Sequence, residues 1–79
     1  MKLPRDLSGA DLIRILCKRF DYAKLGQEGS HVILQTSSPR SHRLAVPNHD
    51  PLRIGTLHGI LKAVARAKEI PLEDLLSEL

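Results

Sequence analysis

The chain has 79 residues and a formal net charge of +3, which is room for a single small domain, and we expect one domain over residues 1–79. One cysteine excludes a disulfide framework and a cysteine-based zinc site. We see no apolar run of signal-peptide or membrane-span length, which favours a soluble protein of the reducing cytoplasm. One Tyr, one Phe and no Trp disfavour proteins that stack RNA bases on a sheet of aromatic side chains.

Residues 12–20 are typical of an amphipathic helix. Ser8 is the expected N-cap, and Asp11 three residues later completes a start that resembles a capping box. The apolar stripe is expected at the helical spacing of i, i+3, i+4 and i+7. Its members are Ile13, Leu16, Cys17 and Phe20. Cys17 on this stripe indicates a core thiol rather than a reactive one.

Residues 22–46 have the pattern of two or three strands. A weak strand is expected over 22–27, followed by a turn at Gly29-Ser30 and a β-branched strand over 31–36. Residues 36–41 contain the polar residues and proline of a hairpin loop. A partner strand over 42–46 stops at Pro47, and residues 47–51 form a rigid loop with two prolines.

The remaining chain predicts two further helices. Gly55-Thr56 opens the first, with Thr56 as its N-cap and an apolar stripe that includes Leu57 and Leu61. Its outward-facing basic residues are expected to be Lys62, Arg66 and Lys68. A short last helix is predicted from Pro71 to Leu76, with acidic residues in its first turn where the helix dipole favours them.

This order of elements predicts an α+β fold in which two helices cover one face of a small antiparallel sheet and the other face meets solvent. An α-β-β-β-α layout like that of double-stranded-RNA-binding domains fits the pattern, with a short helix added at the end. Other small α+β arrangements fit it as well.

The charge is unevenly distributed along the chain. Residues 69–79 carry four acidic residues and no basic one, a local charge of −4, whereas residues 1–68 carry all twelve basic residues against five acidic ones, a charge of +7. RNA is the polyanion that such a basic region favours as a partner. The alternative is that the lysines and arginines only solvate helix faces.

The four histidines have no spacing typical of a metal site. We therefore expect no metal and no other cofactor, although two strands could bring His31 and His42 together. His31 follows the Gly29-Ser30 turn and shares one strand face with Ile33 and Gln35. An accessible histidine, with an ordinary pKa near 6.5, can exchange a proton at neutral pH.

RNA supplies its own nucleophile, the 2′-hydroxyl, so a protein that cleaves it needs a base, an acid and positive charge on the phosphate. His31 could serve in that chemistry, or it could be an ordinary exposed or capping histidine at a strand start. Ser30 lacks the Gly-x-Ser-x-Gly elbow of a nucleophilic serine and is better interpreted as a turn residue.

Three motifs in order carry a family resemblance. They are Gly29-Ser30-His31 before a hydrophobic strand, Val46-Pro47-x-His49, and Gly55-Thr56-Leu57-x-x-Ile60-Leu61-Lys62. Together, within residues 12–64, they resemble the HicA toxin family of mRNA interferases. The resemblance implies a fold like that of double-stranded-RNA-binding domains and a place in a type II toxin–antitoxin system. It also implies a metal-independent endoribonuclease whose catalytic histidine corresponds to His31.

The resemblance further implies two partners, mRNA and a HicB-like antitoxin that binds over the active face; no membrane or DNA partner is expected for this chain alone. The residues that we expect to contact RNA are Lys24, Ser30, Arg40, Arg43, Lys62 and Arg66. Two other hypotheses stay open from the residues themselves. One is a non-catalytic RNA-binding module, and the other is an interaction protein whose basic surface meets an acidic partner.

Overall fold

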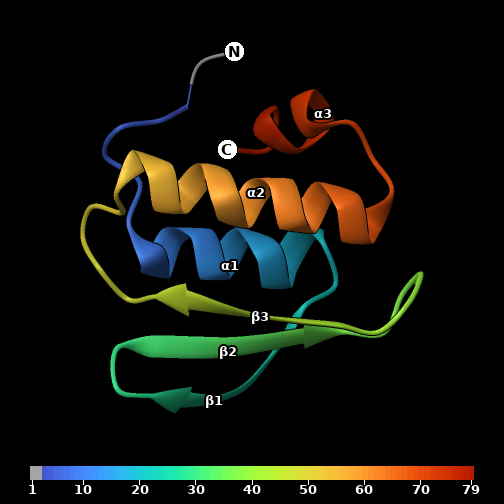
Figure 1. The fold of residues 1–79 in the computed structure, drawn as a ribbon, viewed down its shortest axis with the longest axis horizontal. Helices are drawn as coiled ribbons and strands as arrows, with labels where there is room; N and C mark the ends of the chain where they lie inside the picture. The colour runs from blue at the N-terminus through green and yellow to red at the C-terminus, as the bar shows by residue number, and fades with distance from the viewer. Residues whose placement is uncertain (1–2) are drawn as a thin grey trace.

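The computed structural model describes residues 3–79, and Figure 1 shows its helices on one side of a small sheet. The elements in chain order are α1 (Gly9–Arg19), β1 (Ala23–Glu28), β2 (His31–Thr36), β3 (His42–Pro47), α2 (Ile54–Lys68) and α3 (Leu72–Leu76). The predicted α+β fold with an α-β-β-β-α layout and a short final helix is confirmed. No helix within residues 3–79 is long and apolar enough to cross a bilayer.

The sheet is an antiparallel meander in which β2 lies between β1 and β3. The β2–β3 register runs without interruption from His31 opposite Pro47 to Thr36 opposite His42. The β1–β2 register shifts between Lys24 and Gly26, where β1 contains an irregularity. The two ends of the β2–β3 ladder are the places where the candidate functional side chains lie.

The two faces of β2 differ as its alternation predicts. Val32, Leu34 and Thr36 are buried, whereas His31 is exposed and the next residues on its face are half-buried. The buried face packs against the inner sides of α1 and α2 through a continuous apolar core. Its fully buried members are Leu12, Leu16, Leu34, Val46, Leu57, Leu61, Val64 and Leu75. One sheet face is therefore covered, and the face that carries His31 is open.

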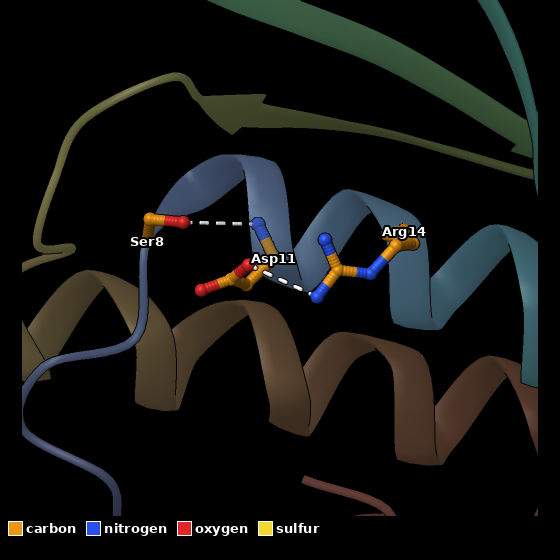
Figure 2. Close-up of polar contacts among 3 residues, drawn as sticks. All are labelled: Ser8, Asp11 and Arg14. Carbon is orange, nitrogen blue, oxygen red and sulfur yellow. Dashed lines mark hydrogen bonds and ion pairs between the residues drawn. The ribbon is translucent and has the colours of Figure 1, made fainter.

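Helix α1 begins with the predicted cap. The Asp11 amide donates a hydrogen bond to Ser8 Oγ at 3.0 Å, and Arg14 donates to Asp11 Oδ1 at 3.0 Å, as Figure 2 shows. The hydrogen bond with Ser8 and the neighbouring Arg14 guanidinium hold the pKa of the Asp11 carboxyl below its ordinary value. The predicted stripe is displaced, because Leu12 and Leu16 are fully buried while Ile13, Cys17 and Phe20 are half-buried at its margin.

Gly9 places the start of α1 directly against the end of β3. A Cβ at this position would collide with the carbonyl oxygen of Pro47. The Gly9 amide also donates to the His49 carbonyl at 2.8 Å. Because only glycine has no Cβ, residue 9 is where α1 and the β3 exit can approach this closely.

Helix α2 begins earlier than the sequence predicted. Arg53, not Thr56, occupies the N-cap position, and its carbonyl accepts a hydrogen bond from the Leu57 amide at 2.9 Å. Leu52 explains the early start, because its side chain is buried in the core and its amide donates to the Leu7 carbonyl at 2.8 Å. These contacts fix the chain just before Arg53, so Thr56 falls inside the first turn. The N-cap prediction for Thr56 is wrong.

Lys68 does not point outward as predicted. Its ammonium donates to Thr36 Oγ1 at 2.7 Å and to the Ser38 carbonyl at 2.6 Å, and it lies 5.0 Å from the centre of the Tyr22 ring. The reason is that Thr36 lies on the buried face of β2, where its hydroxyl needs a partner. Desolvation by this burial lowers the pKa of Lys68.

The acidic end of the chain folds back onto basic residues of other elements. Helix α3 begins at Leu72, one residue later than predicted, because Pro71 occupies the N-cap position, and Leu75 anchors the helix in the core. Glu78 pairs with Arg19 at 3.3 Å and Glu69 pairs with Arg40 at 2.7 Å. These exposed pairs contribute little stability, but they place part of the −4 charge beside positive side chains.

Candidate active site on the open face of the sheet

His31 begins β2 immediately after a two-residue turn. Gly29 adopts a left-handed conformation with φ of 61°, which glycine accommodates without a Cβ clash. The Gln27 side-chain amide donates to the Gly29 carbonyl at 3.0 Å. The turn then delivers His31 to the open face, where its side chain is exposed to solvent.

The backbone around His31 is held from the other side by the β3 exit. The Asn48 amide donates to the Ser30 carbonyl at 2.6 Å, and Pro47 lies opposite His31 in the ladder. Gly9 in turn fixes the Pro47–His49 segment against α1. The imidazole therefore projects into solvent from a backbone that three elements position.

The open face places a carboxylate opposite His31 and a cation farther along the sheet. Glu28 on β1 lies directly opposite His31, so the two side chains leave the sheet on the same side. Gln35 lies four residues along β2, about 13 Å away at the rise of a strand. Arg43 lies opposite Gln35 and donates to its Oε1 from Nε at 3.3 Å and from Nη2 at 3.0 Å.

The other predicted RNA contacts are dispersed over the molecule. Ser30 is exposed in the turn beside His31. Lys24 pairs with Leu34 in the register, which places it on the opposite side of the sheet from His31. Lys62 is exposed on α2, away from the open face. Of the predicted cations, the structure brings only Arg43 onto the face that carries His31.

Arg40 and Arg66 lie at the end of the ladder away from His31. They line a hollow of about 270 Å³ between the β2–β3 loop and α2, together with Ser41, His42, Ala63 and Ala67. Tyr22 fixes His42 there, with its hydroxyl 2.8 Å from Nδ1 and the two rings edge-to-face. This grouping cannot be predicted from the sequence, because no local pattern shows which loop residue will face which turn of a helix.

The remaining chemistry-bearing residues do not form a further site. Within residues 3–79, no three His, Cys, Asp or Glu side chains are grouped so that they could hold a metal ion. Cys17 is half-buried against the core, and this burial raises the pKa of its thiol, which disfavours the reactive thiolate.

These observations define a small α+β protein with a basic surface and an exposed histidine on the uncovered face of its sheet. The family model described as "HicA toxin of bacterial toxin-antitoxin" matches residues 9–65, which is most of the chain. The protein belongs to the HicA toxin family, and the resemblance drawn from the three motifs is confirmed. Membership implies a toxin role and an antitoxin partner. Neither a curated protein nor a solved structure matches the chain significantly.

Proposed function

We propose that this protein is a metal-independent endoribonuclease that cleaves mRNA, with His31 as its proton-transfer group. The observation that carries the proposal is the placement of His31: its imidazole is exposed on an open sheet face while its backbone is fixed by the turn and by Asn48. Membership of the HicA toxin family supports the same chemistry. A positioned, accessible imidazole is what general acid–base catalysis requires.

In the proposed reaction the RNA supplies the nucleophile. A base removes the proton of a 2′-hydroxyl, the 2′-oxygen forms a bond to the adjacent phosphorus, and the bond from phosphorus to the 5′-oxygen breaks. An acid gives that oxygen a proton, so the products are a 2′,3′-cyclic phosphate and a 5′-hydroxyl. His31 performs one or both proton transfers. A metal-bound water is not needed, because the nucleophile belongs to the substrate.

The basic residues are proposed to bind the RNA phosphates rather than to transfer protons. Arg43 shares the face of His31 and is held across the β2–β3 ladder by Gln35, so among the predicted cations it is the one best placed for a substrate phosphate. Ser30 beside the histidine, Lys24 on the other side of the sheet and Lys62 on α2 are proposed as further RNA contacts. The antitoxin is proposed to bind over the open face and to exclude RNA from His31.

The test is cleavage of a long single-stranded RNA by the purified protein in EDTA. We expect cleavage by the wild type and a loss of about 100-fold or more in His31→Ala. His58→Ala is the matched control, since His58 lies on α2 away from the open face, and it should cleave like the wild type. Binding of RNA without cleavage by the wild type would instead indicate a non-catalytic RNA-binding module. No affinity for RNA at low salt would indicate an interaction protein.

A further inference from the structure

We propose that the hollow between the β2–β3 loop and α2 is a binding site for a phosphate group. We call it the loop–helix hollow, and its lining residues are Arg40, Ser41, His42, Ala63, Arg66 and Ala67. It lies at the opposite end of β2 from His31; in Figure 1 the β2–β3 loop and the C-terminal half of α2 are on one side and the β1–β2 turn on the other. It is therefore separate from the candidate active site.

Two guanidinium groups give the hollow its charge. Arg40 uses Nη2 to donate to Glu69 Oε2 at 2.7 Å, which orients the side chain and leaves most of its five N–H donors unused. Arg66 is exposed on α2 and lines the hollow from the other side. Guanidinium groups match the geometry of phosphate oxygens, and charge-assisted bonds of this kind are the strong ones.

His42 adds a third polar group to the hollow. Its Nδ1 lies 2.8 Å from the Tyr22 hydroxyl, and a tyrosine hydroxyl can donate to a ring nitrogen or accept from it. In the proposed site the Tyr22 hydroxyl donates to Nδ1, so the neutral ring carries its proton on Nε2 and offers it as a third donor.

The arrangement favours phosphate over a carboxylate. Donors from Arg40, Arg66 and His42 come from three different elements of the hollow, and phosphate offers at least two unesterified oxygens together with bridging oxygens, whereas a carboxylate offers two oxygens in one plane. Ala63 and Ala67, which also line the hollow, have short side chains that leave room in it for a tetrahedral group. Lys68 adds positive charge nearby, from its place between Thr36 and Ser38.

The source of the phosphate is either an RNA strand or a free phosphate compound. We infer an RNA phosphate, and this part rests on the proposed function. From His31 to the pair of Thr36 and His42 is five residues along β2, about 17 Å. A strand that occupied both sites would extend over several nucleotides, so the hollow would hold RNA at a distance from the cleaved bond.

The first experiment tests the site without RNA. NMR spectra of the wild type are recorded with sodium phosphate and with sodium acetate at equal ionic strength. Phosphate should shift the His42 ring and Arg66 side-chain signals at least three times as far as acetate does. The shift at His42 should disappear in Arg66→Gln and remain in Lys18→Gln, which removes one exposed charge from α1. Equal shifts with the two anions, or an unchanged His42 shift in Arg66→Gln, overturn the proposal.

The second experiment identifies the source. Binding of a fluorescent single-stranded RNA is measured against salt in the His31→Ala background, which does not cleave. Adding Arg66→Gln should weaken binding about 3- to 10-fold and reduce the salt slope by about 0.7, the value for one phosphate of a single strand. An unchanged slope overturns the assignment to RNA and leaves free phosphate as the source. If no variant binds RNA, the proposed function is refuted. The NMR shifts with phosphate then still decide whether the hollow binds a phosphate group.

Discussion

At one end of the β2–β3 ladder His31 lies opposite Pro47, and at the other end His42 lies opposite Thr36. The first end is built from backbone contacts, namely Asn48 to Ser30 and Gly9 to the β3 exit. The second end is built from side chains, with Tyr22 bonded to His42 and Lys68 bonded to Thr36.

The difference shows two ways of using a histidine in one small sheet. Backbone contacts can fix the position of His31 without occupying its ring, which stays exposed for chemistry. Side-chain contacts at the other end use one ring nitrogen of His42 to join β3 to Tyr22. We therefore expect substitutions at the first end to act through backbone geometry, and those at the second end to act through the loss of side-chain hydrogen bonds.

The largest effect on stability is expected from Gly9→Ala, which disturbs the backbone contacts at the His31 end of the ladder. The added methyl meets the Pro47 carbonyl, so α1 and the β3 exit must separate. We expect the free energy of unfolding to fall by about 2–3 kcal/mol, the upper range for overpacking, measured by urea denaturation. Gly59→Ala is the matched control: its Cβ would meet nothing, and alanine inside a helix should stabilise the protein by about 0.5–1 kcal/mol. Equal effects of the two substitutions would contradict the account.

A smaller loss of stability is expected from Lys68→Met, which removes side-chain hydrogen bonds at the His42 end of the ladder. The substitution keeps an unbranched apolar chain but removes the short hydrogen bonds that the ammonium donates to the Thr36 hydroxyl and the Ser38 carbonyl. These two groups then have only the 3.4 Å hydrogen bonds between Thr36 and the Ser38 backbone. We expect a loss of about 1–2 kcal/mol in the free energy of unfolding. Lys18→Met, at an exposed position of α1, should change it by less than about 0.5 kcal/mol. If Lys68→Met left the free energy of unfolding unchanged, the Lys68 ammonium would have no structural role.

The last effect concerns pH and Tyr22, the only tyrosine of the chain. Burial raises its pKa from the ordinary 10 to about 12 in the folded protein. The folded state thus favours the neutral phenol, so this contribution to stability is complete below pH 10 and is lost as the pH rises toward 12. The lowered pKa of Lys68 makes its own contribution to stability increase as the pH rises. The contribution of Tyr22 must therefore be measured separately from that of Lys68.

Absorbance at 295 nm measures the ionisation of Tyr22 directly, and its midpoint should lie near pH 12 in the folded protein. The stability difference between the wild type and Tyr22→Phe, measured by urea denaturation at several pH values, should shrink between pH 10 and 12. A midpoint at pH 10 under folding conditions would mean that the hydroxyl is not desolvated.

The sequence predicted what depends on local pattern. The bounds of β2 follow from a β-branched run between a glycine turn and a polar loop, and its two faces follow from the two-residue repeat of a strand. The Ser8 cap follows from residue types three positions apart. The sequence did not predict what depends on distant contacts. Lys68 bonds to Thr36, 32 residues away, and nothing near Gly9 indicates that the Pro47 carbonyl will lie against it. Arg53 replaces Thr56 as the cap because Leu52 is anchored by Leu7.

Part of the candidate site can likewise be predicted from the sequence. The glycine turn at the head of a strand indicates His31 as a candidate, and the structure places this residue exposed on the open face. Its catalytic role stays a prediction. The position of Glu28 opposite His31 depends on the β1–β2 register. The position of Arg40 and Arg66 around one hollow depends on how the β2–β3 loop packs on α2. Hydrophobic periodicity encodes neither.

The most direct test compares the two histidines in one assay. The rate of cleavage of a single-stranded RNA in EDTA is measured for the wild type, His31→Ala and His42→Ala at a temperature where circular dichroism shows all three folded. We predict a loss of about 100-fold or more in His31→Ala and a rate within about 10-fold of the wild type in His42→Ala, which keeps His31 in place. Full activity in His31→Ala, or equal losses in both variants, would contradict the assignment of the chemistry to His31.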